Sequence, residues 1–156
     1  MTLRSLLDSG ADAAIALSAP ARHPLTYAQL RRHVDTIGRQ LAGQGLHASD
    51  RVAIVLPNGP EMASSFLAVA SYMSAAPLNP NYKRNEYEFY LSDLKPALVI
   101  VEQGSDNPVR QAAAALNIPV AEARVKPEMS AGEFLLFDEE ADIMPASTEQ
   151  EALVLH

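Results

Sequence analysis

The sequence predicts an α/β fold with a largely parallel sheet and crossover helices. Between residues 25 and 125, short apolar segments alternate with longer segments whose apolar residues recur at helical spacing. Several of the apolar segments are rich in β-branched residues and are too short to be helices. Strands and helices that alternate in this way build right-handed βαβ units around one core.

The first helix is predicted to begin at Thr26. Thr26 and Gln29 have the spacing of a capping box, in which each side chain bonds the backbone N–H of the other. Gly43 and Gly45 end this helix, because glycine readily takes the left-handed conformation found at helix C-termini. The apolar side of the helix consists of Leu30, Val34, Ile37 and Leu41.

A buried strand is predicted at residues 51–56, where β-branched residues dominate. The next helix follows directly, with Asn58 as its expected cap and Pro60 at an early helical position. Glu61 complements the positive end of that helix dipole. The helix is rich in alanine and serine, so we expect it to pack closely against the sheet.

A third strand–helix unit starts with the short strand 75–78. Pro77 cannot donate a ladder hydrogen bond, which favours an edge position or a strand end. The following helix is expected to start at Asn85 and to stop at Pro96. Its apolar stripe consists of Tyr87, Tyr90, Leu91 and Leu94.

The last predicted elements are a fully apolar strand at 97–101, a helix at 107–118 and a strand at 119–125. A strand that is apolar throughout is typical of a sheet covered on both faces. We therefore expect residues 1–125 to form an α/β core.

The C-terminal part differs in charge. Residues 1–121 hold ten acidic and ten basic side chains, whereas residues 122–156 hold nine acidic and two basic ones, which gives the net charge of −7. Residues 126–150 are predicted to be an acidic irregular segment with one short strand at 133–137. Residues 151–156 are predicted to be a further strand.

Composition excludes several classes of protein. A chain of 156 residues has the size of one domain, and it has no cysteine for disulfides, thiolate zinc sites or a cysteine nucleophile. No apolar run approaches the length of about 20 residues that a membrane-spanning helix needs, and the chain does not offer the positive surface that a nucleic-acid partner requires. We expect no membrane and no nucleic-acid partner, and a cytoplasmic location.

Familiar catalytic motifs are missing or out of context. Residues 43–48 match the glycine pattern of a dinucleotide fold, but a helix precedes them and a strand follows, which is the reverse of the required order. Ser64 and Ser65 fall inside a predicted helix rather than on the strained turn of a serine hydrolase. His23, His33, His47 and His156 lack metal-ligand spacing, so we predict surface positions for them and no metal site.

Two groups of side chains near the third helix are candidates for ligand binding. Lys83 and Arg84 precede the expected helix start, where they oppose the helix dipole, so they can bind an anion or simply form a solvated basic turn. The nearby aromatic residues can bind a planar ligand or pack in the core, and their helical spacing favours the core. These residues are Tyr82, Tyr87, Phe89 and Tyr90.

From Leu25 to Val101, and again at its end, the sequence resembles the N-terminal part of the adenylate-forming, AMP-binding ligases. This superfamily includes acyl-CoA synthetases, luciferases and the adenylation domains of peptide synthetases. The segments "AAPLNPNY", "EFYLSD", "LNIP" and "LVLH" are most similar to the oxalate–CoA ligase branch.

The resemblance implies that residues 1–156 are an N-terminal fragment of the large ligase domain, ending just before the phosphate loop. The full-length parent would use ATP and Mg²⁺ to convert a carboxylic acid into an acyl-adenylate and then transfer the acyl group to CoA. The phosphate loop, later motifs and a lysine that serve this chemistry lie outside the chain, so no catalytic residue is assigned and no cofactor is expected for the fragment. Lys83 and Arg84 are the candidates for contacting a CoA phosphate.

The resemblance leaves two functional hypotheses. In the first, the chain is the scaffold portion of an AMP-forming acid–CoA ligase acting on oxalate or a fatty acid, is inactive alone, and has the remainder of the ligase as its partner. In the second, it is a truncated, non-catalytic binding or interaction module. If sheet surface is exposed, we expect self-association.

Overall fold

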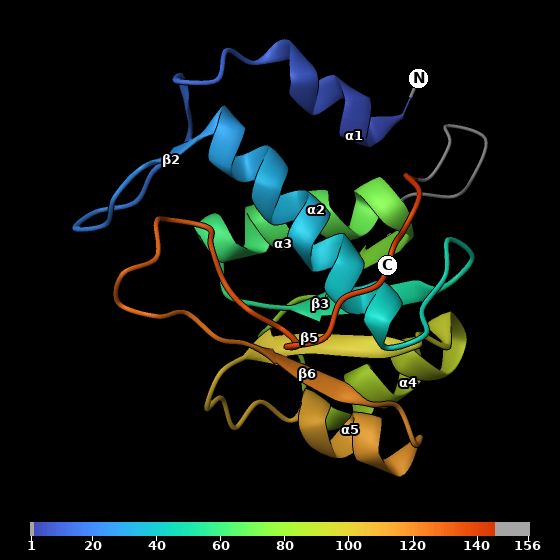
Figure 1. The fold of residues 1–156 in the computed structure, drawn as a ribbon. Coiled ribbons are helices and arrows are strands. Elements are labelled where there is room, and N and C mark those ends of the chain that lie inside the picture. Colours follow the sequence, from blue (N-terminus) through green and yellow to red (C-terminus); the bar gives the residue numbers. More distant parts are fainter. Residues whose placement is uncertain (1, 146–156) are drawn as a thin grey trace.

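The computed structural model describes residues 2–145, which form three layers (Figure 1). A four-stranded parallel sheet has the order β4-β3-β5-β6, with α2 and α3 on one face and α4 and α5 on the other. The strands are β3 (Arg51–Val55), β4 (Ser74–Pro77), β5 (Leu98–Glu102) and β6 (Val120–Ala123). The helices are α2 (Tyr27–Gly43), α3 (Pro60–Tyr72), α4 (Arg84–Leu94) and α5 (Val109–Ala115). The predicted α/β class and the edge position of the strand with Pro77 are confirmed.

The sheet is buried on both faces because its strands are apolar at successive positions. In β3, Val52 and Ile54 face the core beneath α2 and α3, whereas Ala53 and Val55 face the core that contains residues of α4 and α5. Side chains of a strand alternate between faces, so one apolar segment serves both cores.

Helix α2 starts as the sequence predicts. The Thr26 hydroxyl accepts from the Gln29 backbone N–H at 3.2 Å, and the Gln29 amide oxygen accepts from the Thr26 N–H at 2.8 Å. Its predicted apolar side chains are all buried. The other two predicted helix caps are wrong: the N-cap of α3 is Gly59 rather than Asn58, and the N-cap of α4 is Lys83 rather than Asn85.

The N-terminal part contains elements that the sequence analysis did not predict. These are α1 (Leu3–Leu6), the 3-10 helix η1 (Leu7–Ser9), and the antiparallel pair β1 (Ile15–Leu17) and β2 (Leu25–Thr26). The Arg4 guanidinium bonds both carboxylate oxygens of Asp35 on α2, at 2.6 and 3.0 Å, and the Tyr72 hydroxyl donates to the same carboxylate. Burial opposes ionisation of Asp35, but these bonds outweigh it, and the pKa of Asp35 lies below its usual value. They fix α1 to the helical layer.

Residues 126–145 form no helix or regular strand, and the predicted strand at 133–137 is wrong. A single antiparallel bridge joins Leu135 to Arg124. The chain instead crosses α2 in an extended path (Figure 1). The buried Gln40 amide oxygen accepts from the backbone N–H groups of Leu136 and Phe137, both at 3.0 Å. We call residues 126–141 the docked segment.

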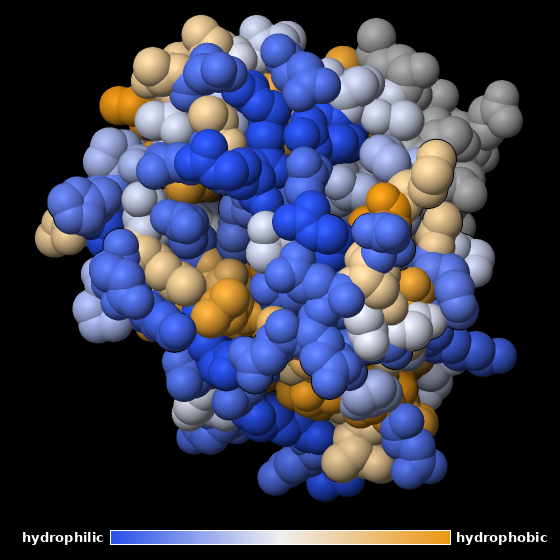
Figure 2. Space-filling view, in the orientation of Figure 1, coloured by the Kyte–Doolittle hydropathy of each residue, from blue (hydrophilic) through white to orange (hydrophobic). Residues whose placement is uncertain are grey.

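The predicted strand 151–156 lies outside the described residues. Within residues 2–145, no helix is long and apolar enough to cross a membrane. On the face seen in Figure 2, hydrophobic residues reach the surface in small separate groups among hydrophilic ones.

Candidate functional site

The carboxyl ends of all four parallel strands meet at one edge of the sheet. In open α/β folds, ligands bind in the crevices outside this edge, where the strand-to-helix loops lie. Here the edge is built by the loops that follow β3, β4 and β5 and by the chain that leaves β6. It lies on the left of Figure 1.

Two hollows flank the β3–α3 loop at this edge. The larger one, of about 640 Å³, lies between Leu56–Asn58 and the chain at residues 77–81. The smaller one, of about 120 Å³, lies on the other side of the same loop and also contacts Glu61 and Glu102. The β3–α3 loop is therefore the shared wall of both hollows, and we take this edge as the candidate functional site.

The wall of the larger hollow is braced from the opposite layer. The Tyr87 hydroxyl donates to the Asn79 carbonyl at 2.7 Å, and the Asn107 amide donates to the Pro80 carbonyl at 2.8 Å. The Asn79 side chain accepts from the Asn81 N–H at 2.8 Å, which forms an Asx turn. The Asn107–Pro80 bond holds the β4–α4 loop against the β5–α5 loop, and the other two bonds fix the conformation of the β4–α4 loop.

The sequence analysis missed the polar residues that line or brace this hollow, namely Asn58, Asn79, Asn81 and Asn107. Their position in the sequence could have indicated a role in the site, because each of these asparagines lies in the loop that follows a predicted apolar strand. In a parallel sheet such positions gather at the carboxyl edge.

Lys83 and Arg84 lie at the start of α4, and the lining of the larger hollow ends at Asn81. The Lys83 N–H is capped by Glu86 at 3.0 Å, and the Arg84 guanidinium pairs with Glu88 at 2.7 Å. Both basic side chains are exposed. Glu88 therefore neutralises part of the positive charge of Lys83 and Arg84 from within the same helix.

The four aromatic side chains divide between core and surface. Tyr87 is fully buried, as the core-packing interpretation expects, whereas Phe89 is 68% exposed. Tyr82 stacks on Tyr90 with ring centroids 5.1 Å apart. Burial raises the pKa of Tyr87, which stays a neutral hydrogen-bond donor to the β4–α4 loop.

The predicted surface position is wrong for His33. This residue lies on α2, is 7% exposed and meets the ring of Phe134 edge-on, with centroids 4.6 Å apart. Burial lowers the pKa of His33 to about 4, so the imidazole is neutral near pH 7. His23 and His47 are exposed as expected, and His156 lies outside the described residues.

The predicted position of Ser64 and Ser65 inside a helix is confirmed. Ser64 and Ser65 lie within α3, and the Ser64 hydroxyl donates to the Gly132 carbonyl at 2.6 Å. Across residues 2–145, no group of three or more His, Cys, Asp or Glu side chains is arranged to hold a metal ion.

The helices and the parallel sheet form a three-layer α/β domain, and solved structures share this fold. The chain superimposes on apo MatB from Rhodopseudomonas palustris with a TM-score of 0.70 at 21% identity, over 94% of this chain and 32% of that one. A model of the family described as "AMP-binding enzyme" matches residues 9–153, and the chain belongs to this family.

Curated relatives agree with the family model. The chain is 36% identical over 105 residues to an oxalate–CoA ligase from Arabidopsis thaliana. The aligned region covers 66% of this chain and 20% of that protein. It is also 41% identical over 95 residues to a probable CoA ligase, CCL9, from Humulus lupulus. That aligned region covers 60% of this chain and 18% of the relative. The resemblance to the N-terminal part of adenylate-forming ligases is confirmed, and the chain spans about a fifth of the length of these relatives.

Proposed function

We propose that this chain is the N-terminal scaffold portion of an AMP-forming acid–CoA ligase. The parent enzyme would join a carboxylate to AMP with release of pyrophosphate, and the CoA thiol would then displace AMP to give a thioester. The observation that carries the proposal is the pair of hollows at the carboxyl edge of a parallel sheet in a chain of the AMP-binding family. The cellular location that we propose is the cytoplasm.

A small dicarboxylate such as oxalate is the proposed acid, supported by the similarity to the Arabidopsis oxalate–CoA ligase; a fatty acid is the other candidate. The chain provides braced loops for binding, whereas transfer of the adenylyl group needs preorganised donors, a lysine and Mg²⁺ around the reacting phosphate. We infer that these groups come from the remainder of the ligase, with ATP, Mg²⁺ and CoA as the parent's cofactors. The fragment alone would be inactive.

The proposed role of Lys83 and Arg84 is electrostatic attraction of a CoA phosphate beside the larger hollow. The fragment is not expected to retain a cofactor, but isothermal titration of the 156-residue chain with excess CoA is expected to show weak, reversible binding. The double charge reversal Lys83→Glu/Arg84→Glu should weaken it about tenfold, since each exposed charge pair contributes up to about 1 kcal/mol. Lys95→Glu, at the opposite end of the same helix, is the matched control and should leave the dissociation constant unchanged.

If the charge-reversed and native chains bind CoA with equal affinity, Lys83 and Arg84 form a solvated basic turn that does not contact CoA. Oxalate-dependent ATP–pyrophosphate exchange by the 156-residue chain alone would contradict both the scaffold function and the alternative, a non-catalytic interaction module. No measurable CoA affinity in the native chain would favour that alternative, in which exposed sheet surface serves self-association.

A further inference from the structure

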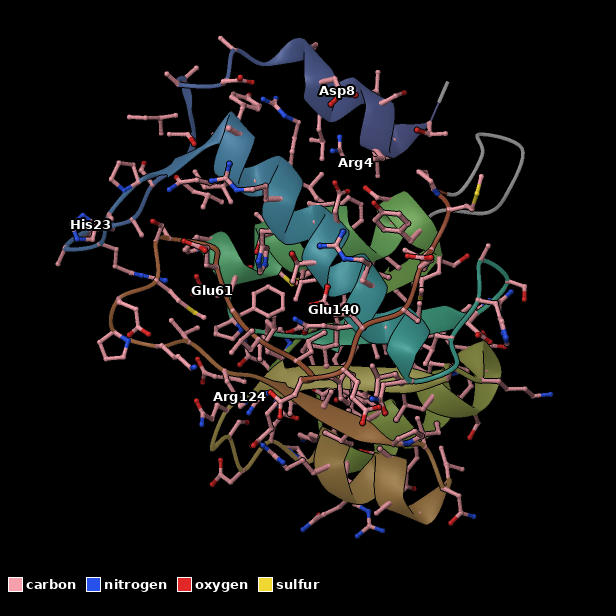
Figure 3. The ribbon with its side chains drawn as sticks, in the orientation of Figure 1. Arg4, Asp8, His23, Glu61, Arg124 and Glu140 are labelled. Atoms are coloured by element: carbon pink, nitrogen blue, oxygen red, sulfur yellow. The ribbon has the colours of Figure 1, made fainter. Side chains whose placement is uncertain are left out.

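One hydrogen-bonded cluster ties together three segments that are distant in sequence. The Glu61 carboxylate oxygen Oε2 accepts from Arg22 Nη1 at 2.7 Å and from the Gly132 backbone N–H at 2.7 Å. Arg22 Nη2 donates to the Ser130 carbonyl at 2.9 Å. The turn after β1, the first turn of α3 and the docked segment are thus joined through two side chains, on the side of the molecule where Figure 3 labels His23 and Glu61.

The cluster is partly shielded from water, which strengthens it. The side chains of Arg22 and Glu61 are 25% and 23% exposed, and hydrogen bonds between ionised groups are about twice as strong as neutral ones. Gly132 has φ +94°, a backbone conformation that residues other than glycine rarely adopt, so glycine favours the turn that brings its N–H to Glu61.

This cluster reaches the candidate site through Glu61. Glu61 is the second residue of α3 and lines the smaller hollow, directly after the β3–α3 loop that separates the two hollows. The Ala63 N–H donates to the Gly59 carbonyl at 3.2 Å and so joins the end of that loop to the helix. A side chain that fixes the first turn of α3 also fixes the end of the loop.

The geometry points to Arg22 and Glu61 as positioning residues that set the conformation of the β3–α3 loop and couple it to the docked segment. The consequence for ligand binding rests on the proposed function, but the coupling itself does not. In this arrangement the acidic C-terminal part of the domain does more than cover α2. It supports a wall of the candidate site through the Arg22–Glu61 pair.

The test is amide hydrogen exchange of the 156-residue chain, measured by NMR at Ala63. Arg22→Ala is expected to make the Ala63 amide exchange about tenfold faster, which corresponds to the loss of about 1.4 kcal/mol from one charge-assisted bond. Glu61→Ala should do the same, and Glu61→Gln, which keeps an acceptor for Gly132 and Arg22, should restore most of the protection. Arg110→Ala, which removes a partly exposed arginine–glutamate pair between α5 and β6, is the matched control.

Arg22→Ala separates coupling from a purely local effect. Glu61 also complements the dipole of α3, and this contribution remains when Arg22 is removed. Unchanged Ala63 exchange in Arg22→Ala would therefore overturn the proposal, as would an equal increase at every amide, which indicates global destabilisation. Titration of the same variants with CoA tests the proposed function and not the coupling. If the native chain fails to bind CoA, the proposed function is contradicted, whereas the hydrogen-exchange result still tests the coupling between Arg22, Glu61 and the docked segment.

Discussion

Replacing Phe134 with alanine is expected to lower the free energy of unfolding by about 3 to 5 kcal/mol, the usual loss when a buried phenylalanine is truncated. Phe134 is 1% exposed and belongs to the core beneath α2 and α3, although it comes from an acidic segment without regular structure. Its ring contacts His33 edge-on, a geometry that aromatic pairs prefer. The variant should therefore detach the docked segment as well as leave a cavity.

Urea unfolding followed by circular dichroism measures this effect. Phe89→Ala is the matched control, because the same side chain is removed from a position that is 68% exposed, and it should change stability by no more than about 0.5 kcal/mol. Similar losses in the two variants would contradict the burial of Phe134 and the docking of its segment.

Stability is also expected to fall as the pH is lowered from about 6.5 to 4, by about 3 kcal/mol through His33 alone. The pKa of His33 is lowered from 6.5 to about 4 in the folded chain by burial. Between these values the unfolded chain binds a proton that the folded chain does not, so this contribution is fully present above pH 6.5 and is lost as the pH falls through 4.

The groups that surround His33 do not readily compensate. Gln29, Arg32 and Thr36 of α2 and Glu133 of the docked segment line a hollow of about 310 Å³ beside it, but burial is the cause of the lowered pKa of His33. Among residues 2–145, the buried His33 Nε2 atom finds no hydrogen-bond partner. Protonation would place an unpaired charge under the docked segment.

Urea unfolding at several pH values tests this prediction, with His33→Phe as the variant that keeps a ring and cannot titrate. The difference in stability between the native chain and the variant should change by about 3 kcal/mol between pH 7 and pH 4. Carboxylates that titrate in this range affect both proteins alike. A difference that stays constant with pH would show that the pKa of His33 is the same in the folded and unfolded chains, and would contradict the prediction.

The strands and helices after residue 25 could be predicted because their signals are local. The Thr26–Gln29 capping box needs only two side chains three positions apart, and an apolar run such as residues 97–101 is decided by its own composition. The predicted caps of α3 and α4 were wrong for two different reasons. Gly59 begins α3 through its backbone conformation, and at the start of α4 the Glu86 side chain accepts from the Lys83 N–H. Neither glycine nor lysine is a residue type from which a helix cap is usually predicted.

The candidate site could be predicted only in part. A parallel sheet implies a functional carboxyl edge, and the resemblance to acid-activating ligases implied the class of chemistry. The choice of Lys83 and Arg84 came from their charge, whereas the hollows are lined by loop residues such as Asn58 and Asn79 whose importance depends on where the loops meet.

What the sequence determined by itself is the α/β class, the order of the strands and helices between residues 27 and 125, and membership of a ligase family, since periodicity, caps and family motifs are properties of neighbouring residues. What only the tertiary structure decided is how residues 126–141 are held. Gln40, Glu61 and His33 look like ordinary polar helix positions, yet they bond or contact residues 71 to 101 positions away. Contacts between residues so far apart depend on the packing of the whole chain, so they cannot be predicted from the local sequence around either residue.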